Sequence, residues 1–278
     1  MIMKKTLLNE CIAEALGTFL FVLIGIASVA ILVATETAMT YWELAIVWGL
    51  SVSLGIYCTA HISGAHLNPA VTISLVAWKK FPIKKMVPYI FSQIIGAFLA
   101  AACDYGLFRS TIISYEQTEG IIRSSSSGAG SAVIFATFPG ANVSLVNAFF
   151  VEFTITMILM LVIYAVTDAN NDGAPIGGLG ALIIGMTVGV CGLAFGALTG
   201  FAMNPARDFG PRLFTLITGW GSTALGPNLY GLIVPILGPI CGAIFAGAIY
   251  FKVLVPYYQK DTNNVIKNIP EKEMVSME

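Results

Sequence analysis

Two stretches of the chain, SGAHLNPAVT (residues 63–72) and TGFAMNPARDFG (residues 199–210), contain the same motif, Asn-Pro-Ala. Proline fits the first turn of a helix, where its missing N–H removes no internal hydrogen bond, and asparagine is favoured just before that turn. Each motif therefore predicts the start of a helix. The apolar runs at roughly 67–78 and 203–217 are too short to cross a bilayer, because twelve helical residues reach only about 18 Å.

The rest of the chain has the composition of a membrane protein. Of its 278 residues, 57% are hydrophobic and only 10% are charged, whereas about a quarter of the residues of a soluble domain are charged. A helix that spans a bilayer needs about 20 mostly apolar residues. Six segments meet this requirement: roughly 12–33, 43–60, 86–108, 145–167, 177–199 and 229–251. The second can extend toward the aromatic pair Tyr41-Trp42, which suits a membrane interface.

Composition and motifs also argue against several classes of protein. The net charge is −1 without any basic stripe, so nucleic-acid binding is not expected. The five cysteines are scattered inside apolar runs and form neither a disulfide framework nor a CxxC metal pattern. No nucleophile–base pair or nucleotide-binding loop is visible in the sequence. We therefore expect no enzyme activity, no cofactor and no metal.

The distribution of positive charge predicts the orientation. With both termini in the cytoplasm, ten of the 14 Lys and Arg residues lie inside and four lie outside, as the positive-inside rule requires. The polar stretch 109–142 then becomes an external loop, and residues 254–278 become a polar cytoplasmic tail. We expect a multi-pass protein of the inner or plasma membrane.

The two halves of the chain repeat one another in opposite orientation. Glu14 and Glu152 are 138 residues apart, and Asn68 and Asn204 are 136 residues apart. Each unit contains three spans, an odd number, so the second unit must be inserted upside down relative to the first. The repeats cover about 8–108 and 145–253. Inverted repeats built around interrupted helices are typical of membrane transport proteins.

In this arrangement the two half helices meet at their amino ends in the middle of the membrane. Their positive dipole ends converge there and repel cations and hydrated protons. The amides of Asn68 and Asn204 can donate hydrogen bonds to a passing hydroxyl or water oxygen. The irregular backbone before each motif, predicted at 61–67 and 200–203, must line a cavity or pack against protein.

With these motifs in place, the chain resembles the major intrinsic protein (aquaporin) family over nearly its whole length, to about residue 253, and specifically the glycerol facilitator (aquaglyceroporin) branch. The resemblance implies a right-handed bundle of six tilted helices around two re-entrant half helices, assembled as a homotetramer with one pore per subunit. It also implies a narrow filter at Trp48, Gly192, Phe201 and Arg207. Gly192 and Phe201 match the polyol-conducting pattern rather than that of strict water channels, and so do Asp208 and Arg212.

For a linear polyol, this filter implies an apolar wedge made by Trp48 and Phe201, opposite the hydrogen-bonding groups. Arg207 and a set of backbone carbonyls would bind the solute hydroxyls, and Gly192 would leave room for the solute. By the same resemblance, Glu14 and Glu152 brace the half-helix loops through hydrogen bonds to backbone N–H groups. The implied carbonyls are those of Gly64, Ala65, His66, Gly200, Phe201 and Ala202.

We therefore expect residues 1–253 to form a single channel domain that passes glycerol, other small uncharged polyols and water, and that excludes ions. One alternative is a proton-coupled secondary transporter that uses Glu14 or Glu152 as its coupling group. A mainly water-selective channel and a purely structural or adhesive membrane protein are the others. His66 offers a further reading as a metal ligand or pH sensor.

Overall fold

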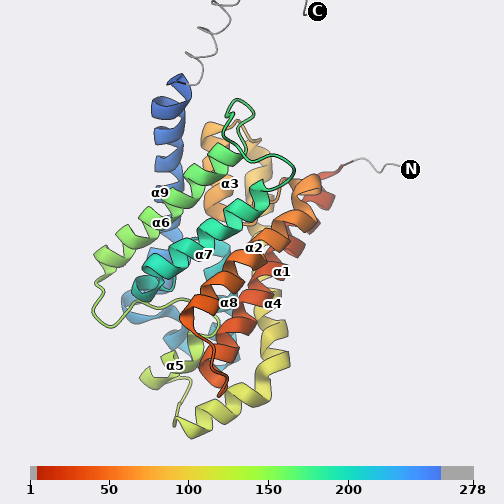
Figure 1. Ribbon diagram of the computed structural model, residues 1–278. Coiled ribbons are helices and arrows are strands. Elements are labelled where there is room, and N and C mark those ends of the chain that lie inside the picture. Colours follow the sequence, from red (N-terminus) through yellow and green to blue (C-terminus); the bar gives the residue numbers. More distant parts are fainter. Residues whose placement is uncertain (1–4, 258–278) are drawn as a thin grey trace, which may run out of the picture.

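The computed structural model describes residues 5–257, and all regular structure within that range is helical (Figure 1). Six helices are long and apolar enough to span a membrane, as predicted, and two shorter helices begin at the Asn-Pro-Ala motifs. The long helices are α1 (Leu7–Ala34), α2 (Tyr41–Ser63), α4 (Ile83–Thr118), α6 (Leu145–Val166), α7 (Gly180–Thr199) and α9 (Tyr230–Ile249); the half helices are α3 (Pro69–Trp78) and α8 (Pro205–Thr215).

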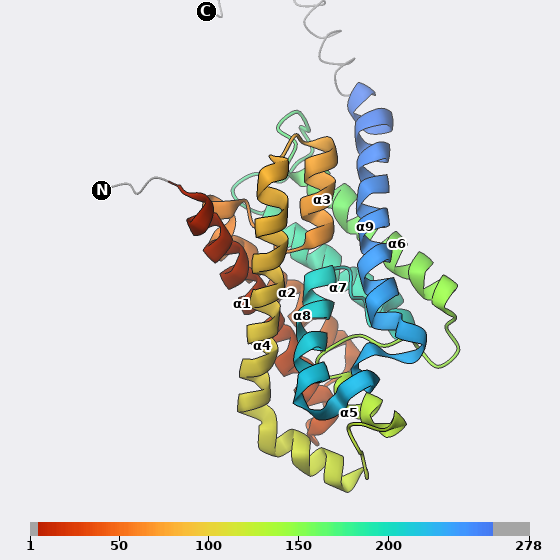
Figure 2. The ribbon, with the colours of Figure 1, turned by 180° about the vertical axis from the view of Figure 1, so that it is seen from behind.

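The half helices start where the sequence predicts. Asn68 and Asn204 are the N-cap residues, and each side-chain oxygen accepts a hydrogen bond from the backbone N–H two residues later, at 2.9 Å in both cases. A proline follows each asparagine in the first turn. α3 and α8 enter the bundle from opposite ends, and their amino termini face each other near its centre (Figure 2).

Within each repeat, the first and last long helices pack at backbone distance. In the first repeat α1 contacts α4, and in the second α6 contacts α9. A Cβ atom on Gly96 would lie 2.2 Å from the carbonyl oxygen of Ala15, and one on Gly242 would lie 2.1 Å from that of Phe153. Only glycine permits this approach, which is how small residues hold membrane helices together.

The described ends of the chain, at residues 5 and 257, lie at the same end of the bundle (Figure 1). An even number of spans requires this. Short 3-10 and π-helical turns complete the chain: η1 (Ser126–Gly128), η2 (Leu216–Trp220), η3 (Gly221–Leu225), η4 (Pro227–Leu229) and η5 (Tyr250–Leu254). Of the predicted tail 254–278, the part beyond residue 257 lies outside the described residues.

The predicted external loop over 109–142 is wrong for residues 109–118, because α4 continues to Thr118 and its far end bends across the bundle (Figure 2). The segment is polar in composition, but Ile112 and Glu116, one helical turn apart, are buried. Glu116 pairs with Arg123 at 2.8 Å. A further short helix, α5 (Ala129–Ala132), lies in the remaining loop.

A second correction concerns the backbone before α3. Helix α2 continues to Ser63 and ends at Gly64, whose φ of 90° lies in the left-handed region that suits glycine. The irregular segment therefore begins at Gly64 rather than at His61, which is helical. In the second repeat, α7 ends in the same way at Gly200, with a φ of 75°.

Candidate functional site

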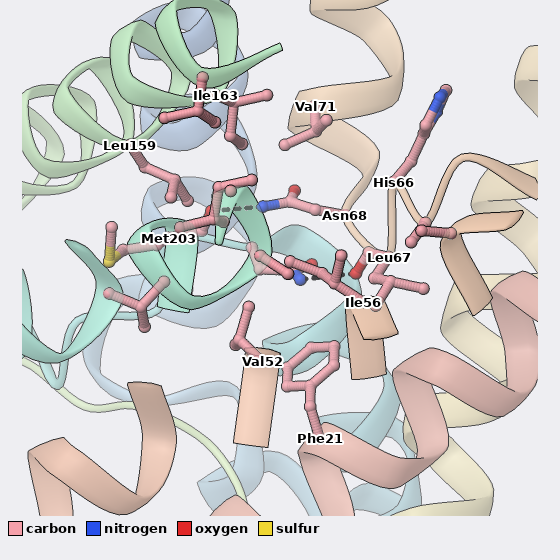
Figure 3. A pocket seen from close by; sticks show the side chains of 18 of the residues that line it. Phe21, Val52, Ile56, His66, Leu67, Asn68, Val71, Leu159, Ile163 and Met203 are labelled. Atoms are coloured by element: carbon pink, nitrogen blue, oxygen red, sulfur yellow. Dashed lines mark hydrogen bonds between the residues drawn. The ribbon is translucent and has the colours of Figure 1, made fainter. Parts of the chain in front are cut away.

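A cavity of about 590 Å³ lies between the long helices, where the two half-helix loops meet (Figure 3). Most of its wall is apolar and comes from α2, α6 and α7, including Val52, Ile56 and Leu159. Its polar groups come mainly from the two loops. Of the predicted pore residues, those that line the cavity are Trp48, Gly64, Ala65, His66, Asn68, Phe201, Ala202, Asn204 and Arg207; Gly192 and Gly200 do not line it.

The two asparagines join the repeats across the centre of the cavity. The Asn68 amide donates to the carbonyl oxygen of Met203 at 2.9 Å (Figure 3). The Asn204 amide donates to the carbonyl oxygen of Leu67 at 2.8 Å. Each amide carries two N–H donors. One therefore holds the opposite loop, and the other is left for a molecule in the cavity.

The backbone of both loops is held in an unusual conformation. Ala65 and Leu67 have φ values of 49° and 50°, and their repeat equivalents Phe201 and Met203 have values of 41° and 54°. Non-glycine residues seldom adopt this left-handed region, which costs about 1–3 kcal/mol each. The surrounding contacts must therefore maintain both loops.

Glu14 supplies those contacts for the first loop. This fully buried carboxylate accepts hydrogen bonds from the backbone N–H groups of His66 and Leu67 at 2.9 and 2.7 Å. Its other donors are the Ser63 hydroxyl at 2.6 Å and the Gln93 amide at 2.7 Å. A carboxylate inside a membrane costs about 2.5–3.5 kcal/mol on an insertion scale, and a hydrogen bond to a charged group returns about 1.5–3 kcal/mol.

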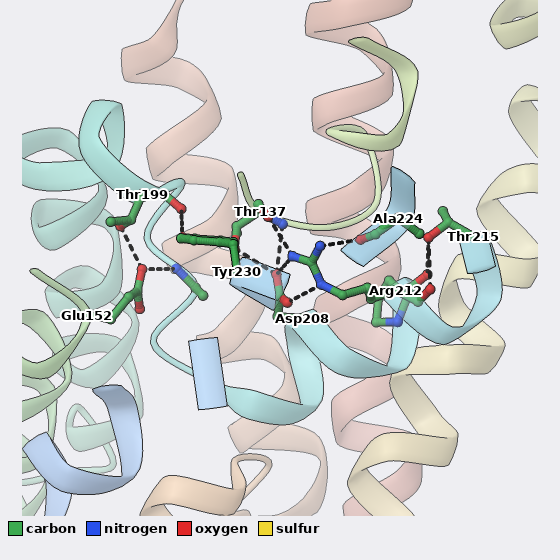
Figure 4. A network of polar contacts seen from close by, with 10 residues as sticks. Thr137, Glu152, Thr199, Asp208, Arg212, Thr215, Ala224 and Tyr230 are labelled. Carbon is green, nitrogen blue, oxygen red and sulfur yellow. Dashed lines mark hydrogen bonds and ion pairs between the residues drawn. The ribbon is translucent and has the colours of Figure 1, made fainter. Parts of the chain in front are cut away.

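Glu152 does the same for the second loop. It is also fully buried, and it accepts from the N–H groups of Ala202 and Met203 at 2.9 and 2.8 Å. The Thr199 hydroxyl donates to it at 2.7 Å (Figure 4). Neither glutamate lines the cavity. The geometry thus gives both glutamates the bracing contacts that the resemblance implies.

One end of the cavity is bounded by Trp48, Phe201 and Arg207. The Trp48 and Phe201 rings meet edge to face, with their centroids 6.3 Å apart. The Arg207 guanidinium lies over the Trp48 ring, 4.2 Å from its centroid, and its buried Nη1 has no hydrogen-bond partner among residues 5–257. This end therefore combines an apolar wall with an unused cationic donor.

Gly192 lies behind the Phe201 ring rather than facing the cavity. A Cβ atom on Gly192 would come within 2.9 Å of Phe201 Cε2. The glycine thus provides the space in which Phe201 sits, and its effect on the cavity is indirect. A Cβ atom on Gly200 would lie 3.0 Å from the Thr137 side chain.

A buried ion pair next to Arg207 holds the loop between the repeats. Asp208 and Arg212 pair at 2.8 Å, and Asp208 also accepts from the backbone N–H and the hydroxyl of Thr137 at 2.8 and 2.7 Å (Figure 4). Arg212 donates to the carbonyls of Thr137 and Ala224. Their four-residue spacing on α8 is readable in the sequence. Nothing local identifies Thr137, which sequence reasoning missed.

His66 is fixed by packing and one hydrogen bond. Its Nδ1 lies 3.1 Å from the Thr72 hydroxyl, and its ring contacts Phe81 and Tyr89, with centroids at 4.5 and 5.1 Å. Within residues 5–257, no group of three or more His, Cys, Asp or Glu side chains is placed to hold a metal ion.

Known proteins match this chain in sequence and in structure. The family model described as Major intrinsic protein matches residues 1–250. The glycerol uptake facilitator protein of Haemophilus influenzae is 46% identical over 254 residues, which are 91% of this chain and 96% of that protein. The propanediol uptake facilitator of Citrobacter freundii is 47% identical over 250 residues, or 89% of this chain and 93% of that protein.

The similarity extends to a solved structure. The X-ray structure of the aquaglyceroporin from Plasmodium falciparum matches with a TM-score of 0.81 and 34% identity, over 91% of this chain and 99% of that one. The resemblance inferred from the two motifs is therefore confirmed. This chain belongs to the major intrinsic protein family.

Proposed function

We propose that the protein is a passive channel for glycerol and similar small uncharged polyols, and also for water, and that it excludes ions and protons. The observation that carries this proposal is the end of the cavity formed by Trp48, Phe201 and Arg207. A polyol has a carbon chain on one side and hydroxyl groups on the other. The two rings offer an apolar surface to the chain, and the free Arg207 donor offers a hydrogen bond to a hydroxyl.

Charge exclusion follows from the same region. Arg207 carries a permanent positive charge at this end of the cavity. The amino ends of α3 and α8 add their positive dipole ends at the centre, and the second N–H of each asparagine can bond a neutral solute there. A cation that crosses the channel would therefore be repelled twice, once by Arg207 and once by the helix amino ends.

The names of similar proteins support the solute class. Glycerol and propanediol uptake facilitators both lie at 46–47% identity. They are transport proteins, which agrees with the expectation that this chain is not an enzyme. We further propose a single channel domain over residues 1–253, a homotetramer, and a location in the inner or plasma membrane with both termini cytoplasmic, on the strength of the family and of the charge distribution.

The decisive experiment uses purified full-length protein in sealed liposomes. Light-scattering swelling rates should be measured for glycerol, propanediol, urea and water, with protein-free liposomes as the reference. We expect glycerol entry to be accelerated and to be unaffected by ionophores that collapse proton gradients. Glycerol entry equal to that of empty liposomes, with water entry accelerated, would instead identify a water-selective channel.

The alternative of a proton-coupled transporter is disfavoured by the two glutamates. Both carboxylates are committed to loop donors and neither lines the cavity. Accumulation of a solute against its gradient, abolished by an ionophore, would favour the coupled transporter over the channel.

A further inference from the structure

Tyr41 and Trp42 are neighbours at the start of α2, but their side chains have different surroundings. Trp42 is 60% exposed on the outside of the bundle, as expected for an interface residue. Tyr41 instead contacts Phe201, with ring centroids 6.4 Å apart and the planes at 80°. Successive residues of a helix are about 100° apart, and Tyr41 shares its face with Trp48, seven residues later. In the sequence both residues suggest a membrane-interface role. In the structure only Trp42 has that environment, whereas Tyr41 packs against Phe201.

Tyr41 thereby extends a row of aromatic rings along the cavity wall. Phe21 contacts Trp48 with centroids 6.5 Å apart, and Trp48 contacts Phe201 at 6.3 Å. These three rings line the cavity, and Tyr41 comes next, just beyond its bounded end. The Phe201 ring is therefore held edge to face on two sides, by Trp48 and by Tyr41.

The structure provides a specific seat for Tyr41. A Cβ atom on Gly196 would lie 2.0 Å from the Tyr41 hydroxyl oxygen and 2.6 Å from Phe201 Cδ1. Gly196 is one turn along α7 from Gly192, whose missing side chain makes room for the same Phe201 ring. Two glycines on α7 thus accommodate the two rings. Phe201 needs such support because its φ of 41° is unfavourable for a residue with a side chain.

We propose that Tyr41 is a positioning residue that sets the selectivity of the channel, because its ring holds Phe201 in place beside Trp48 and Arg207. This inference rests on the proposed channel function and adds a residue to it. With Tyr41 removed, Phe201 loses one of its two edge-to-face ring contacts and can move into the vacated space. The passage beside Phe201 then widens, and discrimination against solutes broader than glycerol falls.

The test compares two solutes of equal chain length and different width: glycerol and 2-methylpropane-1,2,3-triol, which carries one extra methyl group. Their permeability ratio is measured on one liposome preparation, so that protein amount cancels. In Tyr41→Ala the permeability of the branched triol relative to that of glycerol should rise by roughly two- to tenfold, which corresponds to the interaction energy of one aromatic pair. Tyr41→Phe keeps the ring and should keep the wild-type ratio.

Trp42→Ala is the matched control, because it removes a neighbouring aromatic side chain that does not touch Phe201. It should leave the ratio unchanged. If Tyr41→Ala and Trp42→Ala shift the ratio equally, the effect belongs to the helix end and the proposal is wrong. Equal loss of both fluxes in Tyr41→Ala, with an unchanged ratio, would also overturn it, since that is what a merely structural role predicts.

Gly196→Ala provides a second variant if Tyr41→Ala does not fold. Its methyl group would press on both rings, so the branched triol should lose more flux than glycerol. An unchanged ratio in folded Gly196→Ala would contradict the proposal. Absence of glycerol flux in the wild type would instead reject the channel function itself. A wild-type protein that conducts glycerol, with a permeability ratio that does not change in Tyr41→Ala, would reject only the role of Tyr41.

Discussion

Two buried carboxyl groups of this protein differ in how their hydrogen-bonding capacity is used. Both oxygens of Glu152 accept hydrogen bonds from the second loop. Asp104 on α4 is 1% exposed, and neither of its oxygens has a hydrogen-bond partner among residues 5–257. A buried polar group without a partner costs free energy that a satisfied one recovers. The two sites should therefore respond to substitution in opposite directions.

For Glu152, an amide is a poor replacement and an alkyl group a worse one. Glu152→Gln keeps one acceptor oxygen but turns an amide N–H₂ toward a backbone or hydroxyl donor. We expect it to lose about 1–3 kcal/mol of folding free energy and to retain part of the glycerol flux. Glu152→Leu leaves every loop donor unpaired and should yield little folded channel. Thermal melting in detergent and liposome flux would check both; a Leu variant as stable as wild type would contradict the bracing role.

For Asp104, removal of the polar group should help. Asp104→Val has a similar volume and leaves nothing unsatisfied, so we expect the free energy of unfolding to rise by about 1–3 kcal/mol. Asp168→Val is the matched control. Asp168 is also mostly buried, but Tyr250 donates to it at 3.0 Å and the Asn170 backbone N–H at 3.0 Å. Detergent melting should show the two valine variants shifting in opposite directions; a shared direction would refute this account.

The pKa of Asp168, which lies outside the membrane spans, follows from the same contacts. Burial opposes its ionisation, but the hydrogen bonds from Asn170 and Tyr250 and the positive charge of Lys79 outweigh burial, so the pKa is lowered. A carboxylate with a lowered pKa stabilises the fold above its ordinary unfolded value of about 3.9 and loses that contribution as the pH falls through the folded pKa. Asp168 therefore favours the fold at neutral pH.

At the scale of helices, α4 contains two glycines with different surroundings. Gly96 meets the backbone of α1, where a Cβ would lie 2.2 Å from the Ala15 carbonyl oxygen. Gly106 has nothing within 4 Å of its would-be Cβ. Only Gly96 is required by packing. Substitutions at the two glycines therefore distinguish the effect of the helix crossing distance on stability from the effect of helix propensity, within the same helix.

We expect Gly96→Ala to force α1 and α4 apart and to cost about 1–3 kcal/mol. Gly106→Ala should be neutral or stabilising by up to about 1 kcal/mol, because alanine favours a helix over glycine. Melting temperatures of the two variants in one detergent would test this. Equal destabilisation by both would show that the crossing distance does not control stability.

The sequence predicted those elements whose cause is local or repeated. The asparagine caps and prolines fix the starts of α3 and α8, and the repeat spacing identifies Glu14 and Glu152 as equivalent residues of the two repeats. Tertiary contacts could not be read in the same way. The helical extension to Thr118 depends on burial of Ile112 and Glu116, and the position of Thr137 depends on Asp208, 71 residues away.

Within the candidate site, Gly192 shows what a motif leaves out. The resemblance implies a filter role for it, and the structure adds that its missing side chain makes room for the Phe201 ring. Tyr41 shows the reverse. Its pairing with Trp42 indicates an interface, and its contact with Phe201 becomes visible only when α2 and the second loop are seen together.

For the whole molecule, the proposed orientation can be tested with single cysteines. Ser124, between α4 and α5, is exposed and should be extracellular, and Ala169, between α6 and α7, is exposed and should be cytoplasmic. In intact cells, a membrane-impermeant maleimide should label Ser124→Cys, and it should label Ala169→Cys only after permeabilisation. The unmutated chain corrects for its own cysteines, and labelling in the reverse order would invert the topology.

The hydrogen bonds between Asn68 and Met203 and between Asn204 and Leu67 also bear on biosynthesis. The first loop is translated some 136 residues before the second, so its partner does not exist while it enters the membrane. Until residues 203 and 204 arrive, the Asn68 amide and the Leu67 carbonyl are unpaired in a medium without water, a costly state. A nascent chain that stalls between the two loops is therefore an unstable insertion intermediate. We expect membrane quality-control proteases to degrade such a chain faster than the complete protein, in which both hydrogen bonds can form.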